Sequence, residues 1–242
     1  MAQVLICPAN VPPYEAVKNG ADSAVCQACP LRPLMGGGCY VTTGKYIPRV
    51  YEVAKDQVPD LDAACAAIRH SGLTLRVGAW GDPAAVPFEV IERLVDAARS
   101  ATGRARHTMY TSSWQTCDQR LRDVAMASVR TPQERDYAKA AGWRTFRVKV
   151  PEAPVLARER ACPGSKHEVT CSQCLLCSGG MVGGDIVVDA HGSVGVIRAF
   201  RAAVAPTTAN GFLGAPAFGT LQDLLGLADL DLGRSIFSST TD

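Results

Sequence analysis

The pattern of apolar and polar residues changes near Val50. Beyond that point, stretches whose apolar residues recur with the helical period alternate with short apolar runs that are typical of buried strands. Thr131 followed by Pro132 and Glu134 has the spacing of a capped helix start. The pattern predicts helices over residues 61–70, 88–100, 118–129 and 132–142, and strands over residues 73–80, 107–113, 143–150 and 185–190.

Helices and strands that alternate with short connections are typical of a parallel sheet with right-handed crossovers. We therefore expect an α/β fold in which residues 49–159 form the core, either as an open sheet or as a partial or full (β/α) barrel. Residues 1–48 are rich in Cys, Pro and Gly, and residues 160–198 combine a second such segment with a strand. Both are expected to be metal-binding loops. Residues 199–242 are expected to be a C-terminal extension packed on the core, with a helix near residues 221–232.

The composition narrows the class of protein. The chain has 242 residues, of which 47% are hydrophobic and 20% charged, a balance that supports a globular core. A net charge of +2 is too small to indicate a nucleic-acid surface by itself. No apolar run reaches the length of a membrane span, and the N-terminus lacks the basic and apolar regions of a signal peptide. We therefore expect a cytoplasmic protein with no membrane partner.

Ten cysteines in a reducing compartment are expected to bind metal or to carry redox chemistry, because disulfides do not persist there. Four of them form a C-terminal set, in which a Cys-Pro step precedes three cysteines at three-residue spacing. Such a run is typical of iron–sulfur ligation, whereas zinc sites more often use two separated Cys-x2-Cys pairs. The spacing favours a [4Fe-4S] cluster, with zinc as the alternative. The C-terminal set is Cys162, Cys171, Cys174 and Cys177.

An N-terminal set contains one Cys-x2-Cys pair and two outlying cysteines, and it fits zinc and iron–sulfur equally well. If all four cysteines bind, the site is closed and structural. If Cys7 stands aside, the remaining three leave one position open for a substrate or cofactor. Both alternatives stay open at this stage. The N-terminal set is Cys7, Cys26, Cys29 and Cys39.

The ends of the predicted strands carry further candidates, because ligands of parallel α/β folds bind at the carboxyl ends of strands. Gly81-Asp82-Pro83 follows one strand and is a cofactor-binding candidate, unless Asp82 is only a helix cap. His191 follows the last predicted strand and is a candidate general base or ligand.

Several other side chains are candidates for contacts with nucleotides or for ligation. The alternation of Arg144, Arg147 and Lys149 predicts a basic face that meets either phosphates or solvent. Among the other histidines and cysteines, His167 is a possible substitute ligand, Cys117 a possible site residue and Cys65 a core thiol. Aromatic residues that are able to stack on bases are Tyr110, Trp114 and Trp143.

A cysteine-rich loop, then a helix, a strand ending in Gly81-Asp82-Pro83 and further α/β units resembles the radical S-adenosylmethionine superfamily. In that superfamily, three cysteines hold a [4Fe-4S] cluster with one open iron, and a strand-terminal Gly-Gly-Glu-Pro motif holds the amino group of S-adenosylmethionine. The resemblance implies that Cys26, Cys29 and Cys39 are cluster ligands and that the Gly-Asp-Pro turn binds the amino group. The C-terminal set would hold an auxiliary cluster. The family spacing is x3 and x2, whereas here it is x2 and x9.

Three stretches are also similar to uncharacterised cysteine-rich proteins encoded by bacteriophages. They are the segment ending at Cys39-Tyr40, the Gly81-Asp82-Pro83 turn, and the C-terminal set with its strand ending at His191. A bacteriophage origin implies the host cytoplasm as the location and favours a nucleotide or nucleic acid as the partner.

Two hypotheses follow. The first is a radical S-adenosylmethionine-like enzyme with one or two [4Fe-4S] clusters, which acts on a nucleotide or a nucleic-acid base. Asp82 and His191 are its catalytic candidates, and Gly81, Asp82 and Pro83 its cofactor-binding residues. The second is a non-enzymatic α/β binding module that is stapled by zinc or by clusters and contacts nucleic acid.

Overall fold

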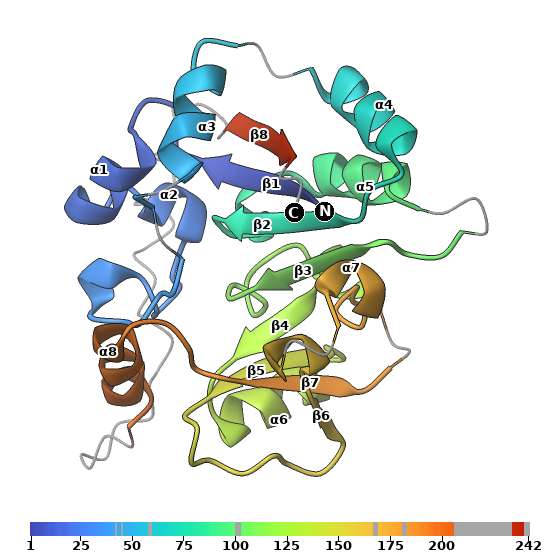
Figure 1. The fold of residues 1–242 in the computed structure, drawn as a ribbon. Coiled ribbons are helices and arrows are strands. Elements are labelled where there is room, and N and C mark those ends of the chain that lie inside the picture. Colours follow the sequence, from blue (N-terminus) through green and yellow to red (C-terminus); the bar gives the residue numbers. More distant parts are fainter. Residues whose placement is uncertain are drawn as a thin grey trace.

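The chain folds around one mixed sheet in which seven parallel strands stand side by side (Figure 1). The computed structural model describes residues 1–41, 43–44, 46–57, 60–99, 103–166, 169–180, 183–205 and 234–239. The strand order is β6-β7-β5-β4-β3-β2-β1-β8, and only β8 is antiparallel to its neighbour. The strands are β1 (Ala2–Cys7), β2 (Leu75–Trp80), β3 (His107–Thr111), β4 (Met126–Val129), β5 (Thr145–Lys149), β6 (Glu159–Ala161), β7 (Asp185–Asp189) and β8 (Arg234–Ser239).

Helices connect most of these strands. The α-helices are α1 (Pro13–Asn19), α2 (Ser23–Cys26), α3 (Tyr46–Ala54), α4 (Leu61–Ser71), α5 (Phe88–Ala97), α6 (Pro132–Ala140), α7 (Cys171–Cys174) and α8 (Val194–Val204). The 3-10 helices are η1 (Pro33–Met35), η2 (Pro83–Ala85), η3 (Gln119–Asp123) and η4 (Pro163–Lys166). No helix among the described residues is both long and apolar enough to cross a lipid bilayer.

Strands β1 to β5 follow one another across the sheet in chain order, and β7 comes next to β5. A chain that always steps to the same side winds in one direction, as in (β/α) barrels, rather than doubling back as in doubly wound folds. The predicted α/β class with a parallel sheet is therefore confirmed. Barrel closure is not seen, because β6 and β8 remain as two edges of the described sheet.

Most of the predicted elements are present with slightly different bounds, namely α4, α5 and α6 and the strands β2, β3, β5 and β7. The predicted start of α6 is also confirmed. The hydroxyl of Thr131 accepts a hydrogen bond from the amide of Glu134 (3.1 Å), and the carboxylate of Glu134 accepts one from the amide of Arg130 (2.6 Å). The helix expected near residues 221–232 lies outside the described residues.

Four strands were not predicted, namely β1, β4, β6 and β8, and one helix was wrongly predicted. Residues 118–129 form η3 and then β4, not a helix. Strand β4 is only four residues long and is almost fully buried, so it shows no alternation that would separate it from a helix turn. Strand β1 lies within the segment expected to be irregular, and it pairs with β2 and β8. The cysteine-rich ends therefore contribute strands to the same sheet as the core.

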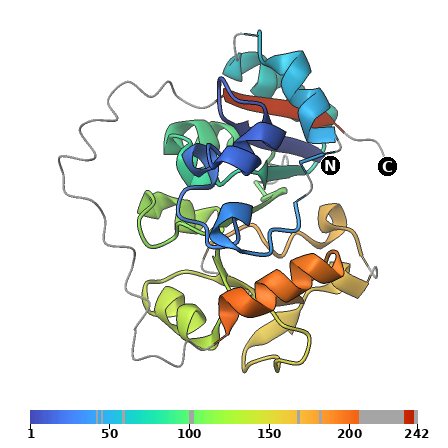
Figure 2. The same cartoon turned by 90° about the vertical axis from the view of Figure 1, so that its left-hand side faces the viewer.

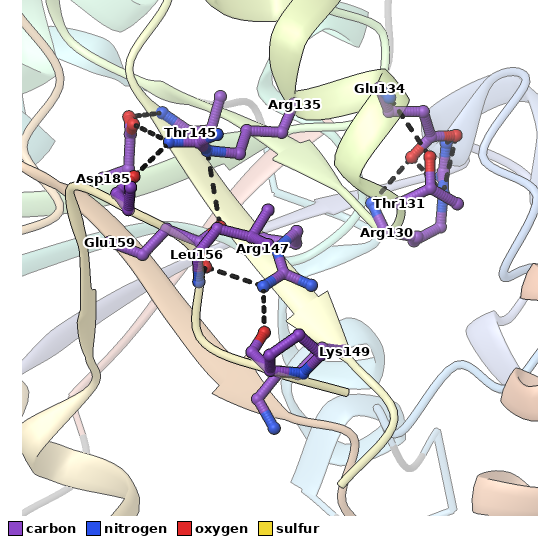
Figure 3. A network of polar contacts seen from close by, with 12 residues as sticks. Arg130, Thr131, Glu134, Arg135, Thr145, Arg147, Lys149, Leu156, Glu159 and Asp185 are labelled. Carbon is purple, nitrogen blue, oxygen red and sulfur yellow. Dashed lines mark hydrogen bonds and ion pairs between the residues drawn. The ribbon is translucent and has the colours of Figure 1, made fainter. Parts of the chain in front are cut away.

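The two faces of the sheet differ in character. On one face, α6 covers the last strands, and a polar network joins it to them (Figure 3). Arg147 of β5 donates to both carboxylate oxygens of Glu159 (2.6 Å each). Lys139 of α6 donates to Asp185 of β7 (2.6 Å), and the amide of Thr145 donates to the same carboxylate (3.0 Å). This network fastens β6 and β7 to the rest of the sheet.

The predicted basic face on β5 is wrong. Arg147 is buried and paired with Glu159, and Lys149 is buried and forms an ion pair with Asp189 (2.5 Å). Arg144, just before the strand, is also buried and donates to backbone carbonyls. Alternating basic residues on a strand had indicated a charged surface, but each of these side chains serves an internal contact.

Candidate active site

The opposite face of the sheet carries a pocket at the carboxyl ends of the strands. Its lining comes from strands β2 to β5, from the residues after β7, from the N-terminal cysteine loop and from α8. Figure 2 looks at this end of the molecule, where the blue N-terminal segments and the orange α8 lie over the strand ends. The residues that carry candidate chemistry are Cys26, Cys29, Cys39, Tyr40, Arg76, Gly81, Asp82, Tyr110, Ser112, Ser128 and His191.

The N-terminal cysteine loop is ordered by its own polar contacts. Arg32 donates to the carboxylate of Asp22 (2.7 Å) and to the carbonyls of Gly20 (2.9 Å) and Gln27 (3.2 Å). The amide of Cys29 donates to the carbonyl of Cys26 (3.1 Å), which makes a tight turn between these two cysteines. The loop thus holds its thiols in place although it has little hydrophobic core of its own.

The Gly-Asp-Pro turn is attached directly to this loop. The amide of Asp82 donates to the carbonyl of Val25 (2.7 Å), next to Cys26. Gly81 has a φ of +80°, and a Cβ there would lie 2.4 Å from the carbonyl oxygen of Ile6 in β1. Only glycine satisfies both the left-handed backbone and this close approach. The two segments singled out in the sequence therefore meet at one place.

The Asp82 carboxylate is occupied by the protein itself. One oxygen accepts a hydrogen bond from the amide of Ala84 (3.0 Å), and the other accepts one from the amide of Ser112 (2.7 Å). Burial raises the pKa of Asp82, and these amides oppose that rise by stabilising the charged form. Asp82 therefore caps η2 and ties the end of β2 to the end of β3.

Three cysteines of the N-terminal set reach the pocket together. Burial raises the pKa of Cys26, and the neighbouring Cys29, Cys39 and Asp82 raise it further. Burial raises the pKa of Cys39 to about 11, and a nearby Cys29 contributes. Mutual effects of this kind show that the thiols are close neighbours. In the metal-free protein Cys26 and Cys39 are thus protonated at neutral pH, and metal binding would displace their protons.

Cys7 is separated from this group. It is fully buried at the end of β1, within the hydrophobic core, and it does not line the pocket. Burial alone raises the pKa of its thiol to about 12. Of the two alternatives left open by the sequence, the structure is compatible with three cysteines at the pocket and Cys7 standing aside.

The C-terminal set lies on the same face of the sheet but at the opposite, amino ends of the strands. The amide of Cys162 donates to Val187 of β7 (2.8 Å), and the carbonyl of Cys177 accepts from Met109 of β3 (3.1 Å). Cys177 packs with Met126 and Ile186, the residues at the starts of β4 and β7. Burial raises the pKa of Cys177 to about 12, and the other three cysteines of the set raise it further.

Arg144 holds the end of this loop. Its guanidinium donates to the carbonyls of Gly179 (2.8 Å), Leu176 (2.8 Å) and Gly184 (2.7 Å). Three carbonyls from one turn thus converge on a buried cation just before β5. The capping box of α7 adds a local restraint, because the amide of Thr170 donates to the side chain of Gln173 (3.0 Å).

Tyr110 connects the two ends of this face. It lines the pocket, its ring packs against Phe146 with centroids 4.3 Å apart, and its hydroxyl is hydrogen bonded to the thiol of Cys177. Arg76 lies on the same face, and its charge interacts with Cys171 of the C-terminal set. Tyr110 therefore lies between the described pocket and the C-terminal set, of which no cysteine lines that pocket.

His191 and Tyr40 form part of the rim. Their rings lie 4.5 Å apart, and the Nδ1 atom of His191 is 3.1 Å from the carbonyl oxygen of Asp189. The exposed His191 is thus at the pocket, as a strand-end residue was expected to be. Trp114 and Trp143 are instead buried in the core and are not available for stacking on bases.

The remaining cysteines and histidines lie away from the pocket or outside the described residues. Cys65 is buried in the core, as predicted, and His107 is buried with its Nε2 atom 2.8 Å from the carbonyl oxygen of Val124. Cys117 is half-buried and does not line the pocket. His167 lies outside the described residues.

The fit of a metal group to these residues rests on the donor chemistry. Within the described ranges, no three Cys, His, Asp or Glu side chains are arranged as a ligand shell. Two groups of thiols nevertheless gather at separate places, and thiolates are the ligands of both zinc and iron–sulfur clusters. The residues therefore fit a thiolate-bound metal in their chemistry and placement, and binding would require the thiols to turn toward one another.

Comparison with family models, with curated proteins and with solved structures finds no match for this chain. The site must therefore be interpreted from its own residues.

Sequence reasoning missed Arg76, Ser128 and α8 as parts of the pocket. Arg76 stands in the middle of a strand, and only the pairing of β2 with β3 shows that it faces the same side as Tyr110. The start of α8 had a signal in the sequence, because serine is a common N-cap residue. In the structure, the hydroxyl of Ser193 accepts a hydrogen bond from the amide of Val196 (3.3 Å).

Proposed function

We propose that this protein is a metal–thiolate enzyme of the radical S-adenosylmethionine type, with its reactive centre at Cys26, Cys29 and Cys39. The observation that carries the proposal is the meeting of these cysteines with the Gly81–Pro83 turn in one pocket at the carboxyl ends of parallel strands. The sequential strand order from β1 to β5 also supports it, because it is the order expected of a partial (β/α) barrel.

The residues have distinct roles in this proposal. The three thiols would hold a [4Fe-4S] cluster, whose open iron supplies one-electron reductive cleavage of S-adenosylmethionine. The Gly81–Pro83 turn offers backbone groups to the amino group of that cofactor. Asp82 acts as a positioning residue, since its carboxylate holds the turn and the end of β3 in place. The remaining walls of the pocket are left for a substrate, which we propose to be a nucleotide.

The C-terminal set is proposed to hold a second metal group, either a cluster or zinc. Four cysteines can complete a tetrahedral shell, so this group would be closed and would act as a staple beneath the pocket. The alternative proposal, a stapled module that contacts nucleic acid, loses its main support, because Arg144, Arg147 and Lys149 are engaged in internal contacts.

The decisive experiment combines metal analysis with an assay of cofactor cleavage on anaerobically purified protein. We expect iron, sulfide and a broad absorbance near roughly 400 nm, where thiolate-bound clusters absorb. After reduction, we expect conversion of S-adenosylmethionine to 5′-deoxyadenosine. Cys29→Ser should abolish this conversion, whereas Cys65→Ser, which alters a core thiol away from the pocket, should retain it.

A colourless protein that contains only zinc would refute the radical assignment. The same conclusion would follow if iron is present and Cys29→Ser cleaves S-adenosylmethionine at the wild-type rate. A circular dichroism spectrum of each variant checks that a lost activity does not reflect a lost fold.

A further inference from the structure

Arg76 is a half-buried cation without a carboxylate partner. It extends from β2 into the pocket, and its guanidinium donates to the hydroxyl of Tyr40 (3.2 Å). No ion pair between Arg76 and an Asp or Glu occurs in the part of the chain that the structure describes, and the groups that interact electrostatically with it are Tyr40, Tyr110 and Cys171. By contrast, the buried Arg147 is neutralised by Glu159.

An unpaired guanidinium at such a position indicates an anionic ligand. Arginine stays charged in proteins, and burying that charge is costly unless an anion and hydrogen-bond acceptors compensate it. The only carboxylate that lines the described pocket belongs to Asp82, and backbone amides already occupy both of its oxygens. An anionic ligand in the pocket would therefore meet the Arg76 guanidinium without competition from a carboxylate of the pocket wall.

The pocket wall next to Arg76 is aromatic. Tyr110 and Phe146 pack together in a tilted arrangement, with an angle of 44° between their rings. Trp80 also lines the pocket, and Tyr40 and His191 form an aromatic rim. Such walls favour a planar ring, because aromatic side chains stack on bases without regard to sequence.

We propose that Arg76 binds the phosphate of a mononucleotide-sized ligand whose base packs against Tyr110 and Phe146. The planar guanidinium fork matches a phosphate in a bidentate arrangement. This inference rests on the proposed function, for which it defines the substrate class, but nucleotide binding itself requires no cleavage of S-adenosylmethionine.

The ligand is a single nucleotide rather than a nucleic-acid strand. A strand-binding groove follows several phosphates with a row of Lys and Arg side chains. Here, Arg76 is the only Lys or Arg that lines the described pocket, and the basic residues of β5 are paired elsewhere. One cation within an aromatic pocket matches one phosphate and one base.

The test uses calorimetric titration of the full-length, metal-reconstituted protein. The titrants are the four ribonucleoside 5′-monophosphates, the matching nucleosides, S-adenosylmethionine and a short single-stranded oligonucleotide. For at least one base, the monophosphate should bind more tightly than its nucleoside. Arg76→Gln should weaken that binding by about 10- to 100-fold, the loss expected for a charge-assisted hydrogen-bond pair, and Arg76→Lys by less. Arg69→Gln, an exposed change on α4, is the matched control and should bind like the wild type.

The other outcomes overturn the proposal. If Arg76→Gln weakens only S-adenosylmethionine, the anion is the carboxylate of the cofactor. If the oligonucleotide binds more tightly than every monophosphate, the ligand is a strand. If Arg76→Gln loses metal but binds nucleotides normally, Arg76 compensates the C-terminal thiolates. Metal content and melting temperature are measured on each variant. Absence of S-adenosylmethionine cleavage alone would refute the proposed function and leave nucleotide binding to be judged separately.

Discussion

The two cysteine sets lie on the same face of the sheet but at opposite ends of its strands. Cys26, Cys29 and Cys39 line a pocket at the carboxyl ends, on a loop that is joined to the Gly81–Pro83 turn. The C-terminal set lies at the amino ends, with Cys177 packed against the hydrophobic starts of β4 and β7. Similar cysteine spacings thus occur at opposite ends of the strands, and parallel α/β folds bind their ligands at the carboxyl ends.

The sets also differ in what holds them. The N-terminal loop is organised by Arg32, which pairs with Asp22, and it borders open space. The C-terminal loop is held by the buried Arg144, and its Cys177 packs against Met126 and Ile186. This difference predicts that damage to the N-terminal set mainly affects chemistry, whereas damage to the C-terminal set mainly affects stability.

The largest stability effect is expected for Arg144→Met. The change removes the donor of one buried and two partly buried carbonyls, which should lower the free energy of unfolding by about 3 kcal/mol. Urea denaturation followed by circular dichroism measures this loss, and Arg160→Met on an exposed position of β6 is the control. A loss below about 1 kcal/mol, the size of one ordinary hydrogen bond, would show that the C-terminal loop does not depend on Arg144.

A smaller effect is expected for Asp82→Asn at the other end of the sheet. Asparagine keeps one acceptor oxygen but places an amide donor opposite a backbone amide of Ala84 or Ser112. We expect a loss of about 1–2 kcal/mol in unfolding free energy, together with a higher KM for S-adenosylmethionine. Asp123→Asn, at an exposed position at the end of η3, is the control. Unchanged stability and an unchanged KM would remove Asp82 from its proposed positioning role.

The smallest expected effect is a loss of stability at acid pH. It should be greater in the strands that carry the C-terminal set than in those near the N-terminus. Burial raises the pKa of Glu159, but hydrogen bonds from Arg147 and the amide of Leu156 lower it more, so the folded pKa lies below the ordinary value. The pKa of Asp185 is lowered in the same way, with Lys139 as the main donor. A lowered folded pKa gives stability that is present above the unfolded pKa and is lost as pH falls through the folded pKa.

We therefore expect the strands that carry the C-terminal set to loosen first as the pH falls below about 4.5, near the ordinary carboxyl range. Hydrogen exchange of β6 and β7 amides at several pH values measures this loosening, with β1 and β2 as internal reference. Glu159→Gln should flatten the dependence. Equal loosening of both regions would contradict the assignment of the effect to this network.

The sequence allowed four strands of the sheet to be predicted but not the other four, and β1 and β4 show why. Helical and extended periods identified α5, α6, β2, β3 and β5, because each has enough residues for its period to be visible. Strand β4 has four residues and is buried on both faces, so no alternation marks it. Strand β1 was hidden for the same reason, as its last four residues are all buried. Short buried strands are recognised by their neighbours rather than by their own pattern.

Site residues could be predicted where residue type and spacing identify them. They could not be predicted where their role depends on the side of the sheet that a side chain faces. The cysteine sets and the Gly81–Pro83 turn were found from their spacing. The basic residues of β5 were wrongly predicted to form a basic surface, because their partners, Glu159 for Arg147 and Asp189 for Lys149, come from later strands. Arg76 was overlooked, because a lone arginine within a strand has no signal until its surroundings are known.

The sequence by itself determined the α/β class, the grouping of the cysteines and the Gly-Asp-Pro turn at a strand end, since these depend on local composition and on spacing along the chain. The tertiary structure decided which cysteines share a pocket, that Cys7 belongs to the core, that Asp82 serves the backbone, and that Arg76 faces the pocket without a carboxylate. These properties depend on strand order and on the side of the sheet to which each side chain points. Both are set by pairings between residues that are distant in the chain.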